Sequence, residues 1–296
     1  MSTLGTVEIP SGRPSPVPST PAPTKRFDIR RVYTALVGIP IVFAAVCLLP
    51  PWGVTLLALT GGSIALLELT RMVFGTRQNE VLTGIVLLLT ALLITSSYWP
   101  VPLGPMLLSG LLAALLTLLW STQPVEFRFR DMGLALFGAL YIGLTLSSLV
   151  TTRALPGGEW LIVFLALVTW AGDTGAYYAG TLWGRHPLAP SISPKKSVEG
   201  LVGGLVLSMI AAVAVQSTLV PQLTTLDALL LGTAMTVTGL LGDLCESAIK
   251  RSVGVKDSGG ILPGHGGMLD RLDSLLFTAP TFYYYVTLVR GIAPLP

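Results

Sequence analysis

Two short sets of polar residues near the end of an apolar chain have the spacing expected of a metal site. The first set consists of Asp243, Glu246, Ser247 and Lys250, and the second consists of Asp270, Asp273 and Ser274. On a helix, where successive residues turn by about 100°, Asp243, Glu246 and Lys250 fall within an arc of about 60°, and Ser247 lies about 40° beyond it. The second set repeats this polar face on a following helix. A tight connection between the two helices would bring carboxylates from both to one point.

Carboxylate ligands of this kind suit a hard cation. Mg²⁺ in particular combines one or two protein carboxylates with water and substrate phosphates. We therefore expect Asp243 and Asp270 to bind Mg²⁺, with Glu246 and Asp273 as alternative ligands. The other explanation is structural, in which the same acids form ion pairs with neighbouring Lys and Arg side chains and anchor the ends of the helices.

The segment between the two sets is rich in glycine and in cations. Glycine lets backbone N–H groups approach a phosphate closely, and the cations add positive charge. We expect phosphate contacts from Arg251, Lys256, His265, Gly266 and Gly267, and a catalytic role for Lys250 and Arg271 beside the two aspartates. The segment lacks both the GxxxxGK[ST] pattern of a P-loop and the strand that precedes a dinucleotide-binding loop, so neither motif is assigned.

Two upstream segments also place polar residues among apolar ones. Asp173 and Thr174 interrupt an apolar helix, either to contact the substrate or to make a buried hydrogen bond to another helix. The segment 193–200 is a loop bounded by proline and glycine, and its substrate-binding candidates are Ser193, Lys195, Lys196 and Ser197. Lysines beside hydroxyl groups suit anionic oxygens, although ordinary interfacial lysines would look the same.

Composition places these residues in a membrane. Hydrophobic residues make up 52% of the 296 and charged residues only 11%, whereas soluble domains are about 25% charged. Uncharged runs exceed the ~18 residues that suggest a span, so we predict an all-α, polytopic membrane protein with about nine transmembrane helices. The expected helices are 32–49, 52–73, 80–98, 104–120, 132–150, 159–182, 200–219, 227–249 and 271–290. A charge at mid-membrane costs about 2.5–3.5 kcal/mol, so acids within these helices must have a partner or a function.

Charge also predicts orientation. Short uncharged turns alternate with charged connections, and every Lys and Arg except Arg153 and Arg290 falls on the side of the N terminus. By the positive-inside rule that side is cytoplasmic, which places the candidate site in the cytoplasm and the C terminus outside the cell membrane. The net charge of +3 is small and its cations are dispersed, so nucleic acid is not an expected partner.

The chain divides into three predicted regions. Residues 1–24 are rich in proline, serine and threonine and read as a disordered cytoplasmic tail. Residues 25–155 carry almost no ionisable group within their helices and are expected to form a transmembrane scaffold. Residues 156–296 contain the polar segments and are expected to form the catalytic region.

The stretch from Ser247 to Asp273 resembles the signature of phosphatidate cytidylyltransferases, also called CDP-diacylglycerol synthases. It reads S-x-hydrophobic-K-R, four residues, K-D, and then P-x-H-G-G-x-x-D-R-x-D. Gly-Asp-Thr-Gly-Ala-Tyr at 172–177 and Ser-Pro-Lys-Lys-Ser-Val-Glu-Gly at 193–200 are similar to two further blocks of that family. The resemblance covers the C-terminal half of the chain, in the right order.

The resemblance implies that CTP and phosphatidate react to give CDP-diacylglycerol and pyrophosphate, with Mg²⁺ and a second cation as in related members. It also implies a homodimer in the lipid bilayer. The lipid phosphate would itself be the nucleophile, so the protein needs only to screen charge, align the substrates and stabilise pyrophosphate.

Two other classes of protein share some of these features. A cation-coupled transporter would also carry acids in its helices, but its polar residues would be spread across the membrane, whereas here they crowd toward one face. A lipid kinase would share the acids and lysines, and it would release a nucleoside diphosphate in place of pyrophosphate.

Overall fold

The computed structural model describes residues 29–75, 79–99, 102–121, 123–260 and 266–293, and the expected tail at 1–24 lies outside them. Its helices are α1 (Ile29–Cys47), α2 (Trp52–Phe74), α3 (Glu80–Ile94), η2 (Ser96–Tyr98), α4 (Leu103–Trp120), α5 (Val125–Arg153), α6 (Gly158–Trp183), α7 (Val198–Leu219), α8 (Thr225–Ser252), α9 (Leu269–Leu272), α10 (Leu275–Tyr284) and η3 (Tyr285–Val289). Its strands are β1 (Pro187–Ala189) and β2 (Ser193–Ser197).

The prediction of an all-α membrane protein is confirmed. Six of the described helices, α2 and α4 to α8, are long and apolar enough to cross a membrane. The predicted number of nine is approximate, because the other three expected positions hold α1, the shorter α3 of 15 residues, and the segment that contains α10.

The last of the expected helices is not continuous. We predicted one helix over 271–290, whereas the structure has α9, a turn at Asp273 and Ser274, then α10 and a π-helical turn. Pro280 lies inside α10 and has no N–H to donate to the preceding turn. Bonds of wider spacing end the segment, as in the donation from the Arg290 N–H to the Tyr285 carbonyl.

A small β-hairpin replaces part of the predicted loop before α7. Pro187 pairs with Ser197 and Ala189 pairs with Ser193 in an antiparallel register. The hydroxyl of Ser197 then accepts a hydrogen bond from the Gly200 N–H at 3.1 Å and caps the N terminus of α7. At the base of the hairpin, the Glu199 carboxylate accepts the backbone N–H groups that follow α6.

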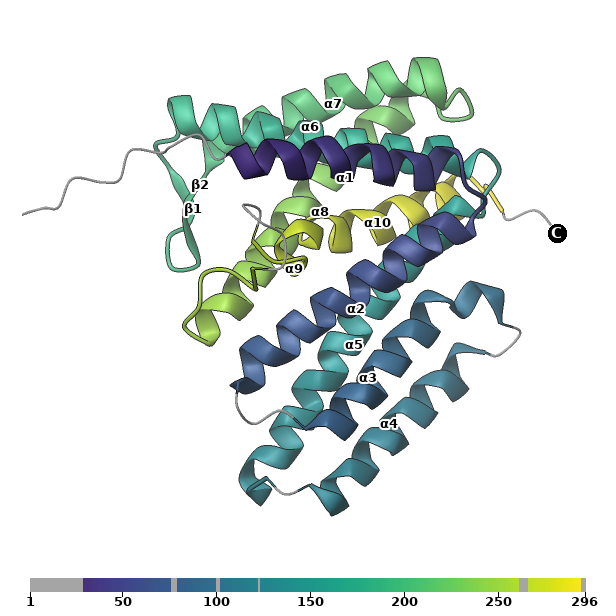
Figure 1. Cartoon of the computed structure of the whole chain (residues 1–296). Helices are drawn as coiled ribbons and strands as arrows, with labels where there is room; N and C mark the ends of the chain where they lie inside the picture. Colours follow the sequence, from purple (N-terminus) through teal and green to yellow (C-terminus); the bar gives the residue numbers. More distant parts are fainter. Residues whose placement is uncertain (1–28, 76–78, 100–101, 122, 261–265, 294–296) are drawn as a thin grey trace, which may run out of the picture.

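The arrangement of the elements separates the two ends of the molecule. Figure 1 shows α2 to α5 gathered on one side of the bundle and α6 and α7 on the other, with α8 and α10 between them. The hairpin and α9 lie near the same end, and the α7–α8 turn lies at the opposite end. Helices α6 to α10 therefore deliver their polar residues to one end of an apolar bundle.

Helices α6 and α7 approach each other closely because both carry glycine at the contact. A Cβ added at Gly203 would lie 2.2 Å from the Ala179 Cβ, and one at Gly175 would lie 2.5 Å from the Gly203 carbonyl oxygen. Small residues that let two backbones meet are typical of helix packing in membranes. This contact holds Asp173 on α6 near the lysines that precede α7.

We expect Gly203→Ala to lower the free energy of unfolding in detergent by about 1–3 kcal/mol, because the new methyl group must push α6 and α7 apart. Thermal unfolding of the purified protein measures this. Gly133→Ala is the matched control, since nothing lies within 4 Å of a Cβ there. Equal melting temperatures for the two variants would contradict the packing argument.

Candidate active site

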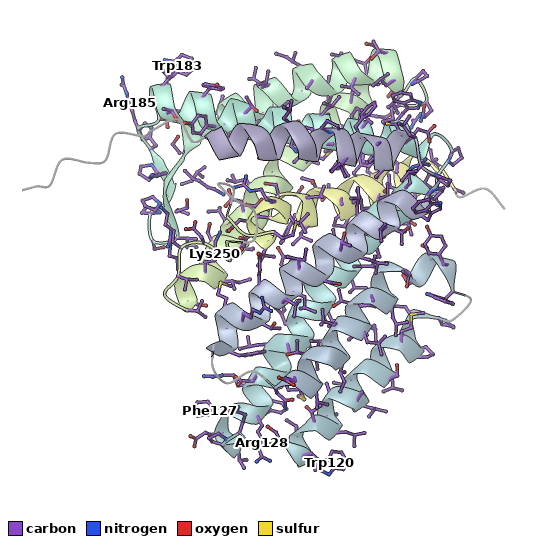
Figure 2. The ribbon with its side chains drawn as sticks, in the orientation of Figure 1. Trp120, Phe127, Arg128, Trp183, Arg185 and Lys250 are labelled. Carbon is purple, nitrogen blue, oxygen red and sulfur yellow. The ribbon has the colours of Figure 1, made fainter. Side chains whose placement is uncertain are left out.

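A cavity of about 770 Å³ lies between α6, the hairpin, α7, α8 and α9. The predicted site residues that line it are Asp173, Lys195, Lys196, Ser197, Asp243, Asp270, Arg271 and Asp273. Arg185, which follows α6 and which the sequence analysis did not select, adds a further cation to the lining. Figure 2 shows Arg185 and Trp183 at the end of α6, on the side of the molecule from which the hairpin projects. The structure thus brings the two upstream segments and the C-terminal segment to one place.

An ion pair crosses the cavity between the lysine segment and α8. The Lys196 Nζ lies 2.7 Å from the Asp243 Oδ2, and both side chains are only partly exposed. Two other acids, Asp173 and Asp273, line the same cavity. Three carboxylates, from α6, from α8 and from the turn between α9 and α10, therefore share one cavity with Lys196, which is paired with Asp243.

Asp270 is saturated with hydrogen bonds. Its Oδ1 accepts from the Lys250 Nζ at 2.5 Å, and its Oδ2 accepts from the Ser258 N–H, the Ser258 hydroxyl and the Gly267 N–H, each at 3.0 Å. Burial alone would raise the pKa of the Asp270 carboxyl, but the Lys250 ammonium and these donors hold that pKa well below its ordinary value. The ionised Asp270 carboxylate thus binds the segment between α8 and α9 at two places, Ser258 and Gly267.

Lys250 stands behind the cavity, between two acids. Its Nζ also lies 2.9 Å from the Glu246 Oε1, one helical turn earlier on α8, and Glu246 is completely buried. Figure 2 shows Lys250 on α8, close to the segment that leads to α9. In this geometry Lys250 holds Glu246 and Asp270 together, and Glu246 does not line the cavity among the described residues.

Sequence reasoning missed Glu68. It is buried in α2 with 3% of its surface exposed, and it accepts hydrogen bonds from Ser258, Met268 and Leu269. The signal was available, because Glu68 is the single acid in the interior of the first five expected helices, and the cost of burying a charge applies to it as well.

Other predicted residues lie away from the cavity lining within the described chain. They are Thr174, Ser193, Lys250, Arg251, Lys256, Gly266 and Gly267. Arg251 donates to the Val255 carbonyl at 3.1 Å, and Gly266 has a φ of 80°, which favours glycine. His265 lies outside the described residues.

Fold and site together define a polytopic membrane protein with a charged cavity at one end of its bundle. The model of the cytidylyltransferase family matches residues 29–289 of the chain. A phosphatidate cytidylyltransferase of Bacillus subtilis is 37% identical over 265 residues, which cover 88% of this chain and 97% of that protein.

Other curated relatives match over a shorter stretch. A phosphatidate cytidylyltransferase of Staphylococcus saprophyticus is 44% identical over 155 residues, or 52% of this chain and 59% of that protein. An uncharacterised Escherichia coli protein, YnbB, is 47% identical over 138 residues, or 47% of this chain and 46% of that protein. The chain thus matches less than two thirds of the length of these two relatives.

The chain belongs to the cytidylyltransferase family. The match extends over most of the chain, including the N-terminal helices that the sequence resemblance did not cover. The family and the enzyme class predicted from the sequence, a nucleotidyltransferase, are therefore confirmed.

We expect Lys250→Met to lower the free energy of unfolding by about 3–5 kcal/mol, because removing one partner leaves Glu246 and Asp270 without their buried cation. Thermal unfolding in detergent measures this. The double variant Lys250→Met, Glu246→Gln is expected to recover part of the loss. Lys256→Met, at an exposed position, is the control, and a melting temperature for Lys250→Met equal to that of the control would contradict the prediction.

Proposed function

We propose that the protein transfers the cytidylyl group of CTP to phosphatidate and so makes CDP-diacylglycerol and pyrophosphate. An oxygen of the lipid phosphate forms the new bond to the α-phosphorus of CTP, and the bond from that phosphorus to the β-phosphate bridging oxygen breaks. The electron pair leaves with pyrophosphate, so the protein supplies no covalent nucleophile. The cavity is the main support for this proposal. It combines Lys and Arg side chains, which could bind the phosphate groups of both substrates, with acidic side chains at one end of an apolar bundle.

The lysines and arginines of the lining would bind the anionic groups. Lys195 and Arg271 are exposed and line the cavity, and Lys196 lies in an ion pair with Asp243. When a triphosphate binds together with its metal cation, Lys196 would bind a phosphate and Asp243 would bind the cation, so the ion pair between the two side chains would be replaced. The ion pair keeps both groups oriented before substrate binds, which limits the reorganisation that catalysis requires.

The acids of the cavity suit Mg²⁺, which would screen the charge between the two anionic substrates. Among the described residues, no three acidic, histidine or cysteine side chains gather closely enough to hold a metal alone. Mg²⁺ commonly takes its remaining ligands from water and substrate phosphates, so one or two carboxylates suffice.

The candidate ligands differ in the hydrogen bonds that they already make. Asp243 keeps its predicted role as a ligand. Asp270 would have to share an oxygen that Lys250 or the loop now binds, whereas Asp173 and Asp273 face the same cavity with fewer donors. We therefore add Asp173 and Asp273 to the candidates.

The cavity also has an apolar part, lined by Gly172, Ala176, Leu201, Met235 and Leu240. These residues lie on α6, α7 and α8, three helices that are long and apolar enough to span the membrane. We infer that the acyl chains of phosphatidate approach from this side, while CTP enters from the cytoplasm. The proposed topology places the hairpin and α9 inside the cell.

We expect purified protein to convert phosphatidate and labelled CTP into lipid-linked CMP and pyrophosphate, with a requirement for Mg²⁺. Asp243→Asn should lower kcat by about 100-fold, which corresponds to a loss of about 3 kcal/mol of transition-state stabilisation. The structural reason is the loss of the charge that orients Lys196 and meets the cation.

Two controls accompany this assay. The exposed Glu126→Gln should keep wild-type turnover, and Asp243→Asn should keep the wild-type melting temperature. Wild-type turnover in folded Asp243→Asn would overturn the role of Asp243, and the absence of a lipid-linked product from wild-type protein would overturn the function. Release of CDP in place of pyrophosphate would point to a kinase.

The proposed orientation has its own test. In a background with both native cysteines replaced by alanine, a new cysteine at Gln222, in the α7–α8 turn, should react with a membrane-impermeant maleimide on intact cells. A cysteine at Ser191, in the hairpin, should react only after permeabilisation, because the hairpin and the α7–α8 turn lie at opposite ends of the bundle (Figure 1). The reverse pattern would contradict the orientation.

A further inference from the structure

Glu68 is a buried carboxylate on α2 that receives hydrogen bonds from the other half of the chain. Its Oε1 accepts the Met268 N–H at 3.0 Å, and its Oε2 accepts the Leu269 N–H at 2.9 Å and the Ser258 hydroxyl at 3.2 Å. Among the described residues Glu68 forms no ion pair, and its described partners are the dipoles of these N–H and O–H groups. All three donors lie about 200 residues further along the chain, at separations of 190, 200 and 201.

The donors come from both sides of the segment that joins α8 to α9. Ser258 precedes the glycine-rich stretch, and Met268 and Leu269 follow it. One carboxylate therefore binds residues on both sides of the glycine-rich stretch. The residues after the stretch lead directly into Asp270 and Arg271, which line the cavity.

Glu68 and Asp270 are coupled through one hydroxyl group. The Ser258 Oγ lies 3.2 Å from the Glu68 Oε2 and 3.0 Å from the Asp270 Oδ2. A hydroxyl has one proton, so Ser258 shares that proton between the two acids. A change at Glu68 is thus transmitted to the oxygen of Asp270 that also binds the Gly267 N–H.

The two glycines beside these contacts leave room for Glu68. A Cβ at Gly259 would lie 2.7 Å from the Glu68 Oε1, and a Cβ at Gly267 would lie 2.6 Å from the Glu68 Oε2. Neither residue has a positive φ, so close approach of the backbone, and not an unusual conformation, requires glycine there. The loop backbone lies directly against the carboxylate.

We propose that Glu68 is a positioning residue for the reaction, acting through the loop to hold Asp270 and Arg271 at the cavity. This rests on the proposed function for its effect on turnover, but the anchoring of the loop is independent of it. Helix α2 is then part of the active-site machinery, although Glu68 itself does not line the cavity.

The test compares Glu68→Gln with Glu80→Gln, which changes an exposed acid at the start of α3. A glutamine keeps the size of Glu68 but presents an NH₂ group to a backbone N–H, so one anchor of the loop is lost. We expect kcat per folded enzyme to fall by about 100-fold, as a displacement of about 1 Å at a reacting group would produce. KM for CTP should change little.

Limited trypsinolysis supplies a readout that does not depend on activity. Cleavage after Lys256, assigned by mass spectrometry, requires local opening of the loop, so it should be faster in Glu68→Gln than in wild type or Glu80→Gln. Ser258→Ala removes only the shared hydroxyl and replaces Glu68→Gln as the test variant if Glu68→Gln does not fold. Ser258→Ala should lower kcat and speed cleavage after Lys256 to a smaller degree. In the double variant, the combined effect on kcat should be smaller than the sum of the two single effects, expressed as free energies.

Three outcomes would overturn the proposal. They are wild-type kcat in the folded variant, wild-type cleavage after Lys256, and a lower melting temperature with unchanged kcat per folded enzyme. If wild-type protein makes no lipid-linked product, the proposed function fails, and the cleavage experiment still decides whether Glu68 anchors the loop.

Discussion

The active-site end of this protein depends on how charged carboxylates are neutralised inside an apolar bundle. Asp270 is held by an ammonium group and three loop donors. Glu68 is held by the N–H groups of Met268 and Leu269 and by the Ser258 hydroxyl, which it shares with Asp270. These contacts offset the cost of burying the two acids, because an unpaired buried charge costs several kcal/mol. The loop has a defined path because it satisfies both acids at once.

The Lys196–Asp243 pair follows a different principle. It lies on the cavity surface, where in the proposed reaction each partner would exchange the other for a substrate group or a cation. The Lys250–Glu246 pair lies behind the cavity, where burial makes exchange unfavourable. One end of α8 thus carries an ion pair at the cavity and, less than two turns later, a buried one that supports the loop.

Much of this could be predicted from the sequence, because hydrophobic run length locates helices and the cost of a buried charge marks residues with a role. The same reasoning located the cavity residues on three distant segments, Asp173, Lys196 and Asp243 among them. It could not find the hairpin, since a pairing of three and five residues leaves no periodic signal, and it did not find the break between α9 and α10.

The contacts of Lys250 and Glu68 could not be predicted from the sequence. Residue type and spacing place Lys250 beside Asp270, but only coordinates reveal that its ammonium is occupied by two acids, so that its most direct effect is on the loop. For Glu68 the obstacle is separation along the chain. The core explains why the contact is stable, because Leu269 and Leu276 pack among the apolar residues of α2, α3 and α5. The N-terminal helices therefore bury apolar residues of α9 and α10 and, through Glu68, bind polar groups of the loop that leads to α9.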